Sequence, residues 1–355
     1  MAFEFIRISD LRNLTECDIA PHSGINLIRG ENGSGKTSLL EAIYILGRGR
    51  SFRDNQLFGA VQKGKKSFTV FGKKRQREDK SAVGITYSNK GGKVSINGKK
   101  VSKLSMLAHE TPIHIITPKS HEILNGGSTT RRRFLDWGVF HVEPLYQHFS
   151  TRYYRALFQR NVALKTNPKN ANIWNNELVE SGIQIQAYRE SYFEYLHKEF
   201  FQQLAIMDVG IQLDVVLYQG WSKEKSLHTV LVDNFPGDEK RRFTRMGPHR
   251  ADLVFTMGRV PLDKLGSRGQ LKMAIFALFL AQANVISSLT NRIPVLLVDD
   301  LTAELDQKNI YKVLGRLTSQ NRQVFITTTD NNLTIPEETG RMFHVEHGMI
   351  SELSV

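Results

Sequence analysis

Residues 30–37 read GENGSGKT and follow directly on an apolar run, INLIR. The spacing Gly30-x4-Gly35-Lys36-Thr37 is that of a P-loop, in which glycines let successive backbone N–H groups point at phosphate oxygens. Lys36 is predicted to reach the β- and γ-phosphates of ATP, and the Thr37 hydroxyl is predicted to ligate Mg²⁺. The predicted nucleotide-binding residues are Gly30, Glu31, Asn32, Gly33, Ser34, Gly35, Lys36 and Thr37.

A second group of candidate residues ends the apolar run PVLLVDD, residues 294–300. In open α/β folds, ligands bind at the carboxyl ends of such strands. Asp299 is predicted to hold Mg²⁺ through its water shell, and Asp300 is predicted to be catalytic together with Lys36, as the base or the polarising group for the attacking water. Two acidic residues after a strand are weak evidence by themselves, but together with the P-loop they indicate an ATPase site.

A third candidate element is GSRGQLK, residues 266–272, at the start of an apolar helix. The N-terminus of a helix attracts anions, so Ser267, Gly269 and Gln270 are predicted to contact phosphate. A simple helix-capping turn is the alternative for this segment.

The order of these elements resembles that of ABC-type ATPases, and the whole chain resembles the RecF family, which is related to the heads of SMC proteins. The resemblance rests on SDLRNL, GENGSGKTSLLEAIYILGRGRSFR, LNGGSTTRRRFLDWGVFHVEP, GPHRADL, SRGQLK, LLVDDLTAELD and FHVEHGMI. It implies a weak, DNA-stimulated ATPase of recombinational repair that binds single-stranded, gapped or junction DNA. It also implies an ATP-driven homodimer that works with the RecO and RecR mediators.

Three positions depart from the pattern of ABC-type ATPases. Gly266 and Arg268 stand where the usual signature has leucine and glycine, and the second acidic residue after the strand is Asp300 where most of these enzymes have glutamate. Aspartate is one methylene shorter, so we expect slow turnover. No switch histidine follows QVFITTT, so no γ-phosphate sensor can be assigned from residues 328–330.

The elements that must position these residues follow from hydrophobic periodicity. Strands are predicted at 3–8, 67–73, 81–88, 93–101 and 113–117, and long helical stretches at 131–165 and 173–207. From residue 267 onward, apolar helices alternate with buried strands, which is typical of a parallel sheet covered by helices. The predicted fold is an α/β ABC-type P-loop ATPase head, with a mixed sheet and an inserted, mainly helical arm lobe but no long coiled coil.

We expect the head to consist of residues 1–110 and 245–355, with the arm lobe at 111–244. Composition supports a cytoplasmic protein: Cys17 is the only cysteine, so no internal disulfide can form, and no run of 18 unbroken apolar residues suggests a membrane span. The formal net charge of +13 favours a polyanionic partner, although a merely basic soluble protein is the alternative. Candidate DNA contacts are the basic clusters Lys63, Lys65, Lys66; Lys73, Lys74, Arg75, Arg77; Lys99, Lys100; and Arg131–Arg133.

Three other functions fit part of this pattern. A transporter ATP-binding subunit would share the P-loop, but the arm lobe and the positive charge argue against this function. A small-molecule P-loop kinase would not need the Ser267–Gln270 element. A DNA-binding protein with a vestigial nucleotide site would keep the same motifs without hydrolysing ATP.

Overall fold

The computed structural model describes residues 2–54, 56–76, 79–258, 260–261, 267–318 and 321–353. The chain divides into two compact units, of which unit 1 comprises Met1–Ser120 and Asn291–Val355 and unit 2 comprises His121–Thr290. The α/β architecture predicted from the sequence is confirmed, and no long coiled coil occurs among the described residues.

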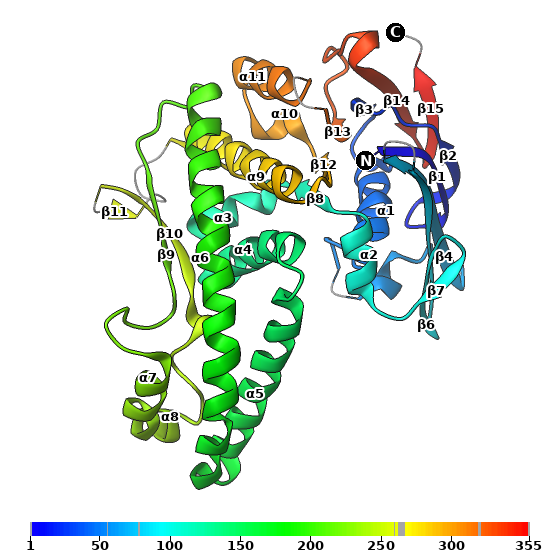
Figure 1. Ribbon diagram of the computed structural model, residues 1–355. Helices are drawn as coiled ribbons and strands as arrows, with labels where there is room; N and C mark the ends of the chain where they lie inside the picture. The colour runs from blue at the N-terminus through cyan, green and yellow to red at the C-terminus, as the bar shows by residue number, and fades with distance from the viewer. Residues whose placement is uncertain are drawn as a thin grey trace. The chain divides into compact units, whose positions relative to one another are not determined.

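Unit 1 contains two six-stranded sheets (Figure 1). The first is antiparallel, in the order β2-β1-β4-β5-β6-β7. Its strands are β1 (Ala2–Leu11), β2 (Leu14–Ile19), β4 (Ser67–Gln76), β5 (Asp79–Ser88), β6 (Gly91–Ile96) and β7 (Lys99–Val101). The predicted Asn-Gly turn joins β6 to β7, with left-handed φ values of 49° at Asn97 and 76° at Gly98.

The second sheet has the order β15-β14-β3-β13-β12-β8 and is parallel except for β15. Its strands are β3 (Ile25–Arg29), β8 (Ile113–Ile116), β12 (Val295–Val298), β13 (Val324–Thr328), β14 (Gly340–Glu346) and β15 (Met349–Leu353). Strands β3, β12 and β13 are almost entirely buried, as their continuous apolar sequences require. The β14–β15 hairpin and β2 were not predicted.

Helix α1 (Lys36–Arg48) packs against strands of both sheets and carries the largest part of the core of unit 1. Leu39, Leu40, Ile43 and Leu46 are fully buried on it. Its C-terminus ends at Gly49 in a left-handed conformation. The remaining helices of unit 1 are α2 (Leu104–Glu110), α10 (Leu301–Glu304) and α11 (Gln307–Thr318). Because α1 begins inside the P-loop, the core fixes the loop's position.

Unit 2 is mainly helical, with α5 (Tyr146–Thr166) and α6 (Asn175–Ile206) packed side by side (Figure 1). The predicted helical stretch 131–165 is divided into α4 (Ser128–Val142) and α5, because Pro144 interrupts it. The other elements are α3 (Glu122–Asn125), α7 (Leu227–Asp233), α8 (Phe235–Arg241), α9 (Arg268–Thr290), β9 (Asp214–Tyr218), β10 (Asp252–Met257) and β11 (Val260–Pro261).

The second unit extends to Thr290, whereas we expected the arm lobe to end at residue 244, and it begins at His121 where we expected residue 111. The difference has a clear physical cause, because β10 pairs with β9 and α9 packs along α6. By length and composition α9 could cross a membrane (mean hydropathy 1.7), but 72% of its apolar stretch is buried inside the structure. A core helix has the same properties.

Candidate functional site

The P-loop connects β3 to α1 in the predicted manner. Gly30, Gly33 and Gly35 all have positive φ values (153°, 82° and 126°), which only glycine adopts easily. Lys36 is buried, and its Nζ donates to Gly30 O at 2.7 Å and Glu31 O at 2.8 Å. Gly35, the N-cap of α1, provides no side-chain acceptor, and the first turn carries no acidic residue. The helix N-terminus is therefore open to an anion.

Two turns that are distant from the P-loop in the sequence form hydrogen bonds with it. The Asn13 side chain, in the turn between β1 and β2, donates to Ser34 O at 2.9 Å and accepts from Ser38 Oγ at 2.9 Å. The backbone N–H of Gly348, in the β14–β15 turn, donates to the same Ser34 O at 2.9 Å. A Cβ at Gly348 would lie 2.0 Å from Asn13 O, so only glycine fits there. Sequence reasoning missed both contacts.

The structure brings Asp299 to the first residues of α1. Thr37 Oγ1 donates to Asp299 Oδ1 at 3.0 Å, and Thr327 Oγ1 donates to the same oxygen at 2.9 Å. The donated hydrogen of Thr37 points at Asp299, so the hydroxyl lone pairs remain available to a cation. Carboxylate and hydroxyl oxygens are ligands that Mg²⁺ accepts, and the pair therefore fits the predicted metal role.

Asp300 occupies an unusual position directly after Asp299. Its φ is 55°, a left-handed conformation that non-glycine residues seldom adopt outside special sites. Its backbone N–H donates to Thr327 Oγ1 at 2.8 Å, while its Oδ1 is buried without a hydrogen-bond partner among the described residues. Thr327 thus contacts the Asp299 carboxylate and the Asp300 backbone, a role that the sequence pattern did not reveal.

The electrostatics of the site are those of clustered, partly desolvated charges. Burial raises the pKa of Asp299, the hydrogen bonds from Thr327 and Thr37 lower it, and the nearby Asp300 raises it further. Burial lowers the pKa of Lys36, and the two carboxylates act in the opposite direction. Two adjacent carboxylates next to the P-loop are an environment that favours a divalent cation.

These residues line one cavity of about 480 Å³ in unit 1. Two arginines that the sequence analysis did not single out, Arg12 and Arg53, also line it. Both contact Glu41 of α1, which is fully buried, with Arg12 Nη2 at 2.8 Å and Arg53 Nη1 at 3.5 Å from its carboxylate oxygens. The cavity is therefore lined by basic side chains as well as by the two aspartates, and it is large enough to hold a polyphosphate.

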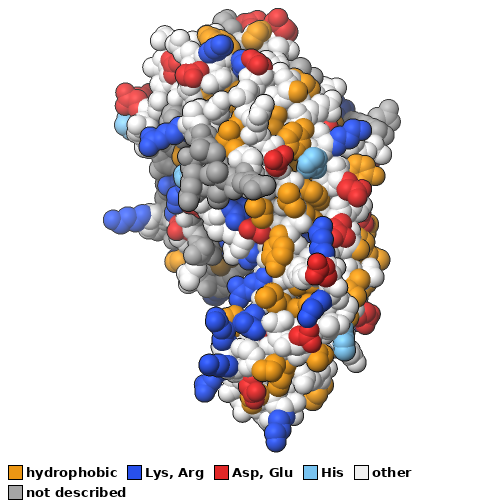
Figure 2. Space-filling model, turned by 90° about the vertical axis from the view of Figure 1, so that its left-hand side faces the viewer, with side chains coloured by type: hydrophobic (Ala, Val, Ile, Leu, Met, Phe, Trp, Pro, Cys, Tyr) orange, Lys and Arg blue, Asp and Glu red, His pale blue; other side chains and the backbone are white. Residues whose placement is uncertain are grey.

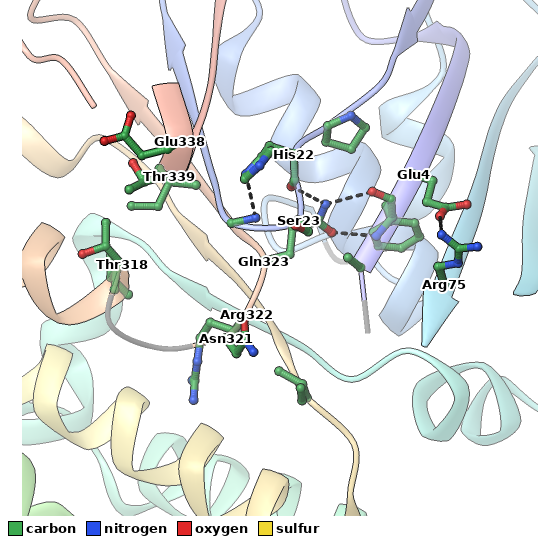
Figure 3. A pocket seen from close by; sticks show the side chains of 17 residues that line it. Glu4, His22, Ser23, Arg75, Thr318, Asn321, Arg322, Gln323, Glu338 and Thr339 are labelled. Carbon is green, nitrogen blue, oxygen red and sulfur yellow. Dashed lines mark hydrogen bonds and ion pairs between the residues drawn. The ribbon is translucent and has the colours of Figure 1, made fainter. Parts of the chain in front are cut away.

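A larger cavity, of about 810 Å³, lies at the other end of the parallel strands of unit 1 (Figure 3). His22 and Gln323 lie just before β3 and β13, at the amino ends of the parallel strands. The Gln323 side chain bonds to the backbone N–H and C=O of Phe3 at 2.7 and 2.9 Å, which joins the two sheets. Because ligands of such folds bind at the carboxyl ends, the smaller cavity is the better candidate.

The Ser267–Gln270 element belongs to unit 2. Gln270 N donates to Ser267 Oγ at 3.3 Å, and Ser267 N donates to Gln270 Oε1 at 3.3 Å, which is a capping box at the start of α9. The Gln270 amide also donates to Gly210 O at 2.9 Å. Ser267 is exposed, while Gly269 and Gln270 are partly exposed. The helix cap is thus formed, and its hydroxyl and amide remain accessible; Gly266 lies outside the described residues.

The predicted basic clusters differ in their exposure. Lys74 is buried and its Nζ lies 2.8 Å from Glu110 Oε1, so its inclusion among DNA contacts is wrong. Arg131 forms an ion pair with Asp252 at 2.7 Å, and Arg132 donates to Ala251 O at 2.8 Å. Both arginines therefore hold unit 2 together. Arg77 lies outside the described residues.

On unit 2, the sequence analysis overlooked another basic group. Lys240, Arg241 and Arg242, at the end of α8, are all exposed. Figure 2 shows lysine and arginine side chains gathering toward the lower part of the face that it presents.

Comparison with known proteins decides the family. The model of the RecF/RecN/SMC N-terminal domain matches residues 2–351. The DNA replication and repair protein RecF of Teredinibacter turnerae is 37% identical, with 97% of this chain and 94% of that protein covered. The RecF protein of Psychromonas ingrahamii is also 37% identical, with 99% of each covered. The chain belongs to the RecF family.

Solved structures agree with this assignment. The structure of "the recombination mediator protein RecF-ATP in RecFOR pathway" has a TM-score of 0.88 at 26% identity and covers 99% of this chain and 97% of its own. An Smc head bound to the C-winged helix domain of ScpA has a TM-score of 0.59 at 14% identity, with 100% of this chain and 98% of that chain covered, and it shares the fold alone. The family comprises repair proteins built on an ABC-type ATPase head.

Proposed function

We propose that this protein is an ATP-dependent DNA-binding protein of recombinational repair and a weak, DNA-stimulated ATPase that releases ADP and phosphate. The observation that carries this proposal is a single cavity that joins Lys36 and Thr37 to Asp299 and Asp300, in a chain that belongs to the RecF family along its whole length. A solved relative is described as RecF-ATP, which supports ATP as the nucleotide.

The residues of the cavity have distinct tasks in this mechanism. Lys36 exchanges the carbonyl oxygens of Gly30 and Glu31 for phosphate oxygens, with little change of position. Thr37 and Asp299 would hold Mg²⁺, which would supply neutralisation of the phosphate charge. Asp300 Oδ1, which is buried and has no described partner, accepts the proton of the attacking water.

The division of phosphate-binding elements between two units supports the proposed homodimer. The P-loop belongs to unit 1 and the exposed Ser267 to unit 2, so a second copy can present its Ser267 to this P-loop and receive the same contact in return. Such an exchange gives an isologous two-fold dimer with two shared sites.

A substitution at the cap tests the dimer. Ser267→Arg places a bulky cation at the exposed position, and we expect it to prevent dimerisation while nucleotide binding continues. Sedimentation is measured at saturating ATP, with Asp300→Asn present in both proteins to block hydrolysis. The protein that keeps Ser267 should sediment as a dimer, and the protein that also carries Ser267→Arg should sediment as a monomer. A dimer that persists with Ser267→Arg would place the interface elsewhere.

DNA and mediator proteins complete the proposal, and we place the protein in the cytoplasm. Family membership supports recognition of gapped or junction DNA and cooperation with RecO and RecR, since a relative is described as part of the RecFOR pathway. The deciding experiment measures ATP hydrolysis and DNA binding with single-stranded, duplex and gapped DNA, with and without RecR. We expect gapped DNA to give the highest rate. DNA binding without any hydrolysis would instead identify a vestigial nucleotide site.

A further inference from the structure

The antiparallel sheet of unit 1 has one covered face and one open face. Phe68, Val70, Val83, Ile85 and Val94 are buried on the covered face, where α1 and α2 pack against its strands. Side chains alternate along a strand, so the residues between them point the other way. On this second face Phe71, Gly84 and Ser95 are half-buried, and Lys73, Lys93 and Lys100 are exposed.

On the open face, Phe71 lies beside a floor of small residues. The strand register places Phe71 of β4 opposite Gly84 of β5, Gly84 opposite Ser95 of β6, and Ser95 opposite Lys100 of β7. An added Cβ at Gly84 would lie 3.7 Å from the Phe71 ring, so the ring borders the glycine. We call Phe71, Lys73, Gly84, Lys93, Ser95 and Lys100 the outer sheet face. A planar group has room beside Phe71, because no large side chain occupies the next two positions of the row.

Positive charge surrounds this floor. Lys73, Lys93 and Lys100 are exposed, and the described part of the chain provides no ion-pair partner for any of them. The two arginines of the same face differ, because Arg7 pairs with Asp18 at 2.5 Å and Arg75 with Glu4 at 3.3 Å (Figure 3). The three lysines therefore keep their full charge for a polyanion.

We propose that the outer sheet face binds the single-stranded part of a DNA gap, with a base stacked on Phe71 and phosphates held by Lys73, Lys93 and Lys100. An aromatic ring with surrounding cations matches single-stranded nucleic acid, because every unpaired base offers a flat face and every nucleotide a charge. In a duplex the base faces are already stacked, so Phe71 would add nothing. This inference rests on the proposed DNA-binding function. It adds that the bound DNA is single-stranded and that the outer sheet face contacts it.

The chain contains a matched control for the aromatic contact. Phe5 lies on the same face, opposite Lys73, but Arg7 and Lys73 already lie 5.5 and 5.9 Å from its ring centroid. Cations over a ring compete with a base for the same π-face. Phe5→Leu should therefore change DNA binding far less than Phe71→Leu, although both substitutions remove one aromatic ring from one face.

The test uses the full chain with a non-hydrolysable ATP analogue and fluorescence anisotropy of labelled oligo-dT, gapped duplex and blunt duplex. We expect Phe71→Leu to weaken binding of oligo-dT and gapped DNA about five-fold or more, with Phe71→Tyr restoring it and blunt-duplex affinity unchanged. Lys93→Gln with Lys100→Gln should flatten the dependence of log K on log salt for oligo-dT by ~1.4. A 4-thiothymidine oligonucleotide should crosslink to the peptide that contains Phe71.

The outcomes separate this inference from the function on which it rests. Wild-type protein that binds no DNA would overturn the proposed function itself. Wild-type protein that binds gapped DNA, with Phe71→Leu and the double lysine variant both unchanged, would overturn only the inference. Equal losses on blunt duplex and oligo-dT would also overturn it, because strand selection would be absent. If Phe71→Leu lowers the unfolding temperature, the salt dependence of the variant with Lys93→Gln and Lys100→Gln still decides the question.

Discussion

Units 1 and 2 use the same types of polar side chain in opposite ways. In unit 1, Lys36 binds carbonyl oxygens of its own loop, and Asp300 keeps a buried oxygen without a described partner, both beside an open cavity. In unit 2, Arg160 is fully buried and donates to Asp238 at 2.8 Å and Thr244 at 2.7 Å. A position on an open cavity therefore distinguishes the candidate ligand site from a buried polar network that stabilises the fold.

This difference assigns roles to two sequence motifs that belong to no general ATPase pattern. In RRRFLDWG, Asp136 accepts from Arg189 of α6 at 2.8 and 2.9 Å. In GPHRADL, Pro248 O accepts from the same Arg189 at 2.7 Å, and His249 bonds to Tyr153 at 2.7 Å. These contacts join α4, α5, α6 and the loop before β10. We conclude that both motifs hold unit 2 together.

The strongest test of this difference between the two units is a substitution at Lys36, which should abolish ATP hydrolysis without loss of stability. In Lys36→Arg the planar guanidinium is too large for the buried ammonium position between Gly30 O and Glu31 O. We expect ATP hydrolysis to fall more than about 100-fold. The matched change Lys65→Arg, at an exposed lysine, should keep the wild-type rate. Hydrolysis at the wild-type rate in Lys36→Arg would show that the cavity is not the ATPase site.

A smaller effect is expected when only the proposed base is changed. Asp300→Asn keeps the size of the side chain but cannot take a proton, so hydrolysis should fall about 100-fold. Binding of a fluorescent ATP analogue should persist, because Lys36 and Thr37 are intact. Asp18→Asn, on an exposed carboxylate of β2, is the control. Equal losses of binding and hydrolysis in Asp300→Asn would assign this residue a structural role instead.

The sequence predicted the residues of the site better than the contacts that orient them. Gly30–Thr37 and Asp299–Asp300 are continuous motifs, so their chemistry could be predicted directly. Gly348 contacts the P-loop because β14 lies beside β3, and Thr327 contacts Asp299 and Asp300 because β13 lies beside β12. Asn13 reaches the P-loop from the β1–β2 turn of the other sheet. Nothing in a single sequence specifies that strand order. The hairpin of β14 and β15 was missed for the same reason, since its burial depends on the neighbouring strands.

The limits of unit 2 were equally hard to predict from the sequence. The stretch 245–290 has the helix and strand pattern of an α/β lobe, yet β10 pairs with β9 and α9 packs on α6. Lys74 gives a local example of the same limit. It stands between two exposed basic residues, but strand alternation turns it inward to Glu110. Composition could not separate it from Lys73 and Arg75.

The smallest predicted effect is a pH dependence of stability that originates in unit 2. The pKa of His249 is lowered to about 4, chiefly by burial and also by the nearby Arg250 and Arg132, against the hydrogen bond to Thr244 O and the charge of Asp238. The unfolded chain has the ordinary value of about 6.5, so between pH 6.5 and 4 it binds more protons than the folded protein. Stability is therefore complete above pH 6.5 and falls toward pH 4, by at most about 3 kcal/mol.

Denaturant unfolding at several pH values measures this effect, with His249→Gln as the reference. Glutamine does not titrate, so the free energy of unfolding should depend on pH less steeply in the variant, by up to about 1.4 kcal/mol per pH unit near pH 5. Carboxylates also titrate in this range, but they contribute equally to both proteins and cancel in the difference. ATP binding at neutral pH should be the same in both, because His249 belongs to the polar network of unit 2 and the nucleotide cavity to unit 1. Parallel pH profiles would show that His249 is protonated equally in the folded and unfolded chains. The burial of His249 between Tyr153 and Thr244 would then be wrong.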